Sequence, residues 1–397
     1  MRKDILTSKV ERGSPKERIR AAFAHTEGDR VPLFEQSFAS DVASEILGRQ
    51  AFTGTTYLHY QEACAWTKGE EAHREFEQQV YRDVVDLALA LNFDMLHPPW
   101  RLSERPARQV DEYTFLYGDP EGDYTVYRFD PVSKTFAVAK TVTRTKIEDP
   151  DDLEPLVEEA ERRASEYEIE DPEQEFPWQA RMLREYGDKF EVTGGVGLLI
   201  PPEPVWLMAC ALRPDLVARK LDADLSIACK SLEAQARLGL KVIWGGGDLA
   251  DKNGPIYGPK VFQELLLPRL KALTDKCHEL GLVYVFRTDG NLWPIEHEFF
   301  EESGIDGYGE IDYEAGMDLA LLKPKYGKRI TFWGNVPCGT ILINGSKQEV
   351  TEFTKRLIDV AAPGGGFILG SSNSIMPGTP ARNVMAMIET ALTYGCY

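Results

Sequence analysis

The stretch PKVFQELLLPRLKALTDKCHELGLVYVFRTDGN, residues 259–291, decides the fold of this chain. Its first part predicts a helix over residues 259–280, because proline suits a helix start and Gly281 suits a helix end. The apolar residues 283–287 then predict a short buried strand that breaks into a charged turn. One helix leading into one strand is the repeating unit of an α/β protein.

Short apolar strands and longer helical patterns alternate along most of the chain. Further helices are expected at residues 317–326 and 347–361. The eight expected strands are residues 31–35, 93–96, 190–194, 242–246, 283–287, 305–309, 330–334 and 367–370. Strands separated by helices pair in parallel, and eight such units form a (β/α)8 barrel. The alternative is an open doubly wound sheet, but no GxGxxG motif opens a helix after the first strand.

The whole chain, residues 1–397, is expected to form a single (β/α)8 TIM barrel domain with two additions. Residues 1–30 form a helical N-terminal extension, since Ser14, Pro15 and Glu17 are typical of a capped helix start. Residues 113–140 alternate apolar and polar side chains around a Gly/Asp/Pro turn, which predicts a small β-hairpin insertion after the second strand.

Composition and charge exclude several classes of function. The formal net charge is −19, which argues against nucleic-acid binding and against docking on anionic lipid. The most apolar stretch, residues 192–212, is interrupted by Pro201, Pro202 and Pro204, so no membrane span is expected. The six cysteines form no CxxC pair and the N-terminus has no apolar signal segment, which favours a cytoplasmic protein with reduced thiols.

The candidate site is the carboxyl-terminal mouth of the barrel, where strands end and loops begin. Asp289 and Glu310 are the candidate catalytic acids or bases, because burial can raise the pKa of a carboxyl toward neutrality. Arg287 is expected to bind a carboxylate or phosphate, or to neutralise one of these two carboxyls. The candidate substrate-binding residues are Glu35, His97, Asp248, Asn253, Asn291, Tyr308, Asn335 and Asn373.

Each of these residues also has a structural interpretation. A polar side chain just past a strand often caps the next helix or closes a turn. Gln36, Ser371 and Ser372 occupy similar positions. Cys338 is a weak candidate for a metal ligand, because a lone cysteine is more often a packed thiol.

Several motifs together resemble the uroporphyrinogen decarboxylase-like superfamily. They are KERIRAAF at 16–23, DRVP at 29–32, Asp248 with NGP at 253–255, DGN at 289–291, GNVPC at 334–338, GGGFILGSS at 364–372 and PGTP at 377–380. The resemblance runs over nearly the whole chain and implies a (β/α)8 barrel with a deep mouth.

The resemblance points to one of two branches. Uroporphyrinogen decarboxylases carry an arginine-rich segment near their start that holds the carboxylates of the substrate. The matching segment here, VPLFEQSFAS at 31–40, has no arginine, which disfavours porphyrin decarboxylation. The other branch, corrinoid-dependent methyltransferases, moves a methyl group between a small donor and a corrinoid-carrying partner protein.

The same resemblance implies a degraded zinc site. Several methyltransferases of that branch bind zinc through His-x-Cys-Gly after the fifth strand and a distant cysteine after the eighth, or through two histidines and a cysteine. The matching residues here are Arg287, Asp289, Cys338 and Ser372 or Asn373. Arginine cannot bind a metal and asparagine binds zinc poorly, so only Cys338 remains as a soft ligand.

The leading hypothesis is therefore a methyltransferase that demethylates a methoxylated aromatic in anaerobic metabolism. Its corrinoid (cobalamin) would sit on a partner protein, and aromatic residues near the mouth motivate an aromatic donor. Asp289 or Glu310 would protonate the leaving oxygen, and Arg287 would anchor a carboxylate or the developing phenolate. The alternatives are a metal-free decarboxylase of small carboxylic acids and a non-catalytic family member. Barrels of this superfamily are often homodimers.

Overall fold

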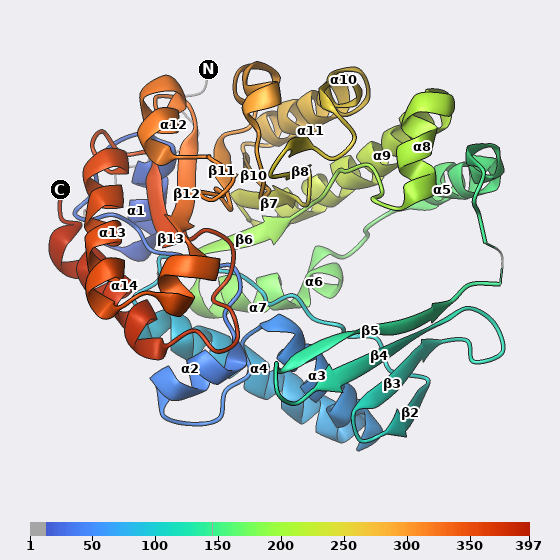
Figure 1. Cartoon of the computed structure of the whole chain (residues 1–397), viewed down its shortest axis with the longest axis horizontal. Helices are drawn as coiled ribbons and strands as arrows, with labels where there is room; N and C mark the ends of the chain where they lie inside the picture. Colours follow the sequence, from blue (N-terminus) through green and yellow to red (C-terminus); the bar gives the residue numbers. More distant parts are fainter. Residues whose placement is uncertain (1–12, 145) are drawn as a thin grey trace.

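A parallel sheet that curls around a packed interior is the centre of the fold (Figure 1). The computed structural model describes residues 13–144 and 146–397. All neighbouring strands of this sheet are parallel, and their order in space follows their order in the chain. The strands are β1 (Met95–Leu96), β6 (Glu191–Gly195), β7 (Val242–Gly246), β10 (Val283–Arg287), β11 (Gly307–Gly309), β12 (Thr331–Val336) and β13 (Phe367–Ser371).

The expected first strand closes the barrel through isolated bridges and is not a full strand. On one side, the backbone N of Phe34 donates to Leu369 O over 3.1 Å and Leu369 N donates to Pro32 O over 2.8 Å. On the other side, Asp94 N donates to Leu33 O over 2.8 Å. Proline has no backbone N–H, which limits the ladder here. This segment lies between β13 and β1 and completes the ring of eight strand positions. The predicted (β/α)8 fold is therefore confirmed.

Helices follow the strands and form the outer ring. The first segment leads into α2 (Ser40–Leu47), α3 (Thr55–Thr67) and α4 (Glu70–Ala90). The later helices are α5 (Glu154–Glu166), α6 (Pro172–Glu175), α7 (Pro177–Tyr186), α8 (Pro204–Leu212), α9 (Pro214–Leu238), α10 (Pro259–Val261), α11 (Leu267–Glu279), α12 (Leu319–Tyr326), α13 (Lys347–Ala361) and α14 (Ala381–Tyr394). A π-helical turn joins α10 to α11, and α13 matches its predicted bounds. In the part of the chain that the structure describes, no helix has the length and apolarity to cross a bilayer.

The barrel interior is filled by a cluster of large side chains. Side chains alternate along a strand, so every second residue faces inward. Phe34 stacks on Trp244 with 5.4 Å between ring centroids, and Trp333 lies 5.1 Å from Trp244. Helix α1 (Pro15–Phe23) packs against this cluster with Ile19 and Ala22. The barrel interior is therefore a packed core. Helix α1 covers the end of the barrel at which the strands begin.

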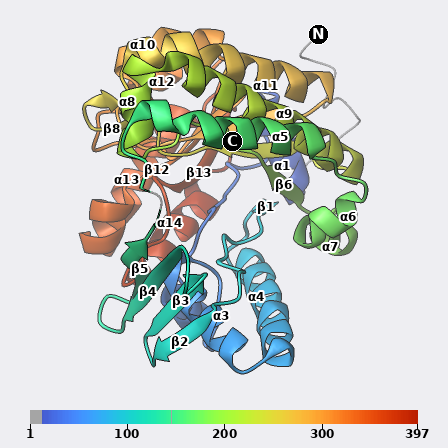
Figure 2. The same ribbon diagram turned by 90° about the vertical axis from the view of Figure 1, so that its right-hand side faces the viewer.

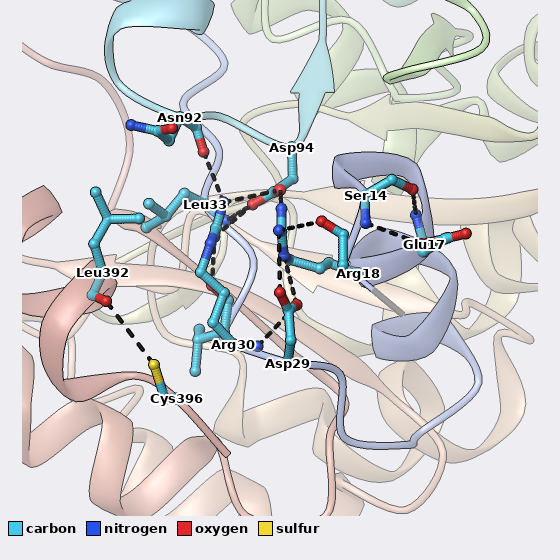
Figure 3. A network of polar contacts seen from close by, with 12 residues as sticks. Ser14, Glu17, Arg18, Asp29, Arg30, Leu33, Asn92, Asp94, Leu392 and Cys396 are labelled. Carbon is cyan, nitrogen blue, oxygen red and sulfur yellow. Dashed lines mark hydrogen bonds and ion pairs between the residues drawn. The ribbon is translucent and has the colours of Figure 1, made fainter. Parts of the chain in front are cut away.

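Asp94 ties α1 and the first segment to the barrel wall (Figure 3). Its buried carboxylate accepts hydrogen bonds from Nη1 of Arg18 at 2.7 Å, from Nη1 of Arg30 at 2.8 Å and from the backbone N of Leu33 at 2.7 Å. Arg18 also binds Asp29 at 2.7 Å. We refer to these residues as the Asp94 cluster. The Ser14–Glu17 capping box that starts α1 is present as predicted, and residues 1–12 of the expected extension lie outside the described residues.

The insertion after β1 is larger than the predicted hairpin. It is a four-stranded antiparallel sheet in which β3 and β4 form the expected hairpin and β2 and β5 extend it on either side. Its strands are β2 (Arg108–Asp111), β3 (Thr114–Gly118), β4 (Tyr124–Asp130) and β5 (Thr135–Val142). All four residues of β2 are exposed, so that strand carries no apolar alternation to reveal it. Both views show the inserted sheet beside α3 and apart from the barrel (Figures 1 and 2).

Candidate active site at the barrel mouth

Arg287, the last residue of β10, is held at the mouth by groups from distant parts of the chain. Its Nη1 donates to Oε1 of Gln36 over 2.5 Å and lies 3.5 Å from Oε1 of Glu310. Nε2 of Gln36 donates in turn to the Glu310 carboxylate and, over 3.2 Å, to the backbone O of Asn373. The ends of the first segment, β10, β11 and β13 therefore meet around one guanidinium.

Asp289, two residues beyond β10, is a carboxyl that holds a proton near neutral pH. Its Oδ2 accepts a hydrogen bond from Nδ2 of Asn373 at 2.7 Å. Burial, and then the negative charge of Glu310, raise the pKa of Asp289 to about 7, although the Asn373 bond opposes this. Such a carboxyl can both donate and accept a proton at neutral pH.

Two further carboxyls, those of Glu310 and Glu35, are also buried. Burial raises the pKa of Glu310, and Arg287 and Gln36 offset part of that rise. Glu35 accepts hydrogen bonds from Ser371, from the backbone N at 2.6 Å and from Oγ at 2.7 Å. Burial raises the pKa of Glu35 to about 8. Burial thus raises the pKa of all three carboxyls, and Glu310 lies beside the Arg287 guanidinium.

His97 follows β1 and enters the same site as a neutral ring. Its Nδ1 lies 2.6 Å from Oγ1 of Thr193 in β6. Burial, and then the charge of Arg287, lower the pKa of His97 to about 3. The sequence pattern of polar residues after a strand does not single out Thr193, because Thr193 lies inside β6. The available signal was that Thr193 shares its strand face with Glu191, two residues earlier.

Within the described part of the chain, the predicted residues at the ends of β7 and β12 make no side-chain hydrogen bond or ion pair with Arg287, Asp289 or Glu310. Asp248 is exposed, and its negative charge adds to the raised pKa of both Asp289 and Glu310. Sγ of Cys338 lies 3.4 Å from Oγ of Ser372, and burial raises the pKa of the Cys338 thiol. Asn335 is fully buried and donates to the backbone O of Met317 at 3.3 Å.

Tyr308 is fully buried, which does not favour the expected contact with substrate. Burial, and then the negative charge of nearby Asp289, raise the pKa of its hydroxyl. Its neighbours in β11, Gly307 and Gly309, take the inward-facing positions, so its ring points outward. The ring centroid lies 5.6 Å from that of Phe299 and 5.4 Å from that of Phe300. Tyr308 is therefore a core residue between the barrel wall and the helices.

Asn253 and Asn291 are likewise engaged in local turns. The backbone N of Asn253 donates to Oδ1 of Asp251 over 2.7 Å, and the Asn253 side chain is exposed. Oδ1 of Asn291 accepts from the backbone N of Trp293 over 3.0 Å, as a helix cap does. The structure does not bring these two amides into the group around Arg287.

The residues at the implied zinc positions do not fit zinc. Arg287 and the Asn373 amide present N–H donors to Gln36 and Asp289, and N–H groups do not coordinate a cation. Cys338 offers one thiol, short of the sulfur and imidazole ligands that structural and catalytic zinc sites use. We therefore assign no step of the chemistry to zinc.

A separate acidic group lies outside the barrel. Within residues 13–144 and 146–397, the one set of three close metal-binding side chains is Glu62, His73 and Glu77, on α3 and α4. Arg101 forms ion pairs with both glutamates, at 2.7 Å for Glu77. A guanidinium thus already neutralises this group, which is a structural tie between helices α3 and α4 and the loop after β1.

Part of the chain is similar to a known family. Residues 204–394 match the family model described as uroporphyrinogen decarboxylase (URO-D). This match confirms the predicted resemblance to the uroporphyrinogen decarboxylase-like superfamily. The matched region includes Arg287, Asp289, Glu310 and Asn373, whereas the motifs before residue 204 lie outside it.

Relatives of two kinds are similar to this chain. The methylcobamide:CoM methyltransferase of Methanosarcina acetivorans is 26% identical over 139 residues, 35% of this chain and 38% of that protein. A uroporphyrinogen decarboxylase of Wolbachia sp. subsp. Brugia malayi is 23% identical over 184 residues, 45% of this chain and 48% of that protein. The chain thus matches less than half the length of these relatives. A solved methyltransferase from Methanosarcina mazei shares the fold, with a TM-score of 0.61, 18% identity, and coverage of 96% of this chain and 99% of that one.

Proposed function

We propose that this protein is a corrinoid-dependent methyltransferase. It would take a methyl group from a methoxylated aromatic donor and pass it to a corrinoid on a partner protein. The observation that carries the proposal is the Asp289 carboxyl, with a pKa of about 7, in a mouth that also holds Arg287. The similarity to a methylcobamide:CoM methyltransferase supports this branch of the superfamily.

Asp289 supplies the proton that ether cleavage needs. An aryl ether oxygen leaves poorly unless a proton or a Lewis acid neutralises the charge that develops on it. The reduced corrinoid supplies the nucleophile that accepts the methyl group as the carbon–oxygen bond breaks. The proton of Asp289 passes to the phenolate oxygen, and the product is a phenol. Asn373, which donates to Asp289 Oδ2, then stabilises the carboxylate that remains.

Arg287 orients the donor. Its Nη1 is taken by Gln36 and Glu310, but its Nε has no hydrogen-bond partner among the described residues. The Nε atom itself is buried, but the side chain is 31% exposed, so another part of the guanidinium can be reached from the mouth. A planar guanidinium edge holds a carboxylate or a phenolate oxygen well. A methoxylated benzoate would satisfy Arg287 with its carboxylate and present its ether oxygen to Asp289.

A metal-free decarboxylase of small carboxylic acids is the second candidate. It is favoured by the partly exposed guanidinium of Arg287, which can hold one carboxylate, and by the similarity to uroporphyrinogen decarboxylases. Asp289 in its ionised form would then stabilise a developing positive charge. A tetrapyrrole with many carboxylates fits poorly, because residues 31–40 bring no arginine to the mouth.

An anoxic assay with reduced corrinoid tests the proposal. The purified protein is mixed with free corrinoid and with methoxylated benzoates, methanol or methylamines, and the corrinoid spectrum is followed. We expect methylation of the corrinoid with a methoxylated benzoate. Asp289→Asn should lower kcat by about 10²–10⁴-fold, the usual contribution of a general acid. The matched control Asp251→Asn alters an exposed turn and should leave kcat unchanged.

Other outcomes separate the alternatives. Release of carbon dioxide from a small acid, without methyl transfer from any donor, would favour the decarboxylase. If the folded protein shows neither corrinoid methylation nor carbon dioxide release, a non-catalytic family member would be favoured. Full activity of Asp289→Asn would remove the role given to that carboxyl.

A further inference from the structure

The inserted sheet carries a cavity that the proposed reaction does not use. It lies between the loop that follows β1 and one end of strands β3, β4 and β5, and its volume is about 290 Å³. Leu102 and Glu104 line it from the loop, and Tyr117 and Tyr127 line it from the sheet. Figure 2 shows this sheet beside α3 and below the barrel helices. The volume is close to the lower limit of small-molecule sites.

The walls of the cavity are aromatic and its rim is acidic. The rings of Tyr117 and Tyr127 meet edge to face, with 5.4 Å between centroids, and continue the aromatic cluster under the sheet. Glu104 and Asp123 contribute exposed carboxylates. Among the described residues that line the cavity, none is a lysine or an arginine. Aromatic faces and carboxylates together attract a cation.

The hydroxyl of Tyr117 gives an independent sign of a ligand. Tyr117 is 4% exposed, and its hydroxyl has no hydrogen-bond partner within residues 13–144 and 146–397. Burial, and then the nearby carboxylates of Glu62 and Glu104, raise the pKa of Tyr117, so the hydroxyl keeps its proton. A buried hydroxyl of this kind is normally paired. A ligand with an acceptor oxygen would pair it.

We propose that this cavity binds a small organic ammonium ion that also carries an oxygen. The cationic group would lie against the tyrosine rings, near the carboxylates of Glu104 and Asp123. The oxygen would accept the hydrogen bond from the Tyr117 hydroxyl. An anionic ligand is disfavoured, because both charged groups at the rim are carboxylates. This binding site is independent of the reaction proposed for the barrel mouth.

Calorimetry on the full chain with choline as the probe tests this site. We expect saturable binding of one choline, and none of its uncharged isostere 3,3-dimethylbutan-1-ol. Tyr117→Phe removes only the hydroxyl and should weaken choline binding by about 2–12-fold. Glu104→Gln should weaken it by about 2–5-fold, as expected for an exposed charge pair. Glu121→Gln, an exposed acid on the β3–β4 turn that does not line the cavity, is the matched control.

Each contrary result has a definite meaning. Equal binding of choline and its isostere would overturn recognition of the cation. Choline binding that neither Tyr117→Phe nor Glu104→Gln weakens would place the ligand elsewhere, including the barrel mouth. Absence of saturable binding for both choline and tetramethylammonium would overturn the site. Because Glu104 is exposed, its variant stays informative even if Tyr117→Phe unfolds.

Discussion

Replacing Asp94 with asparagine tests how the N-terminal segment closes the barrel. Asp94 is fully buried and accepts hydrogen bonds from Arg18, Arg30 and the backbone N of Leu33 (Figure 3). The variant keeps the shape of the side chain but removes its charge. An amide has one acceptor oxygen, and its NH2 group would face guanidinium donors. At least one arginine would therefore lose its partner.

The expected loss of stability follows from the burial of the cluster. The side chains of Arg18 and Arg30 are each only 11% exposed. Removing one partner from a buried ion pair costs about 3–5 kcal/mol. Arg18 keeps Asp29 as a second partner, so we expect the lower end, about 3 kcal/mol. For 397 residues, an unfolding entropy of roughly 2.1 cal/mol/K per residue makes this a fall in Tm of about 4 °C.

Urea unfolding followed by tryptophan fluorescence measures this loss. The matched control is Asp86→Asn, since Asp86 pairs with Arg49 on the surface with its side chain 51% exposed and should lose at most about 1 kcal/mol. Hydrogen exchange should also quicken in residues 15–34 and stay unchanged in α13. If Asp94→Asn and Asp86→Asn unfold at the same urea concentration, the account of barrel closure is wrong.

Three other predictions concern the barrel and its mouth. Gly309→Ala would place its Cβ 2.2 Å from Cε3 of Trp333, so overpacking should lower the free energy of unfolding in urea by about 1–3 kcal/mol. In the control Gly195→Ala, the nearest atom to the new Cβ is 3.5 Å away, so the loss should be smaller. Asp289 binds its proton more tightly in the folded chain, with a pKa of about 7 against an ordinary 3.8, so the free energy of unfolding should fall as pH rises from about 4 to 7. Asp289→Asn should reduce that fall, to which Glu35 and Glu310 also contribute, and should be more stable than the parent protein at about pH 8 but not at about pH 4; equal differences at both pH values would contradict this. Dialysis against a chelator should leave corrinoid methylation unchanged, and a loss that added zinc restores would refute our assessment of the metal positions.

The candidate site could be predicted from sequence where a residue directly follows a strand. Arg287 ends its strand and Asp289 and Glu310 follow theirs, and the structure brings these three segments together at the mouth. Tyr308 is harder to place from sequence, because it lies inside a strand, where its orientation depends on which neighbours face the barrel. The inward glycines Gly307 and Gly309 held that information, but the sequence alone does not say which face of a strand is inside.

The sequence by itself determined the alternation of strands and helices, the capped start of α1 and the positions at which polar residues follow strands. These depend on local patterns of apolar residues, glycine and proline. Only the tertiary structure decided that Gln36 binds Arg287, 251 residues away, and that Asn373 binds Asp289. It also decided the pKa values of the mouth, because desolvation depends on every segment that packs around a carboxyl. Such long-range contacts leave no trace in a local pattern.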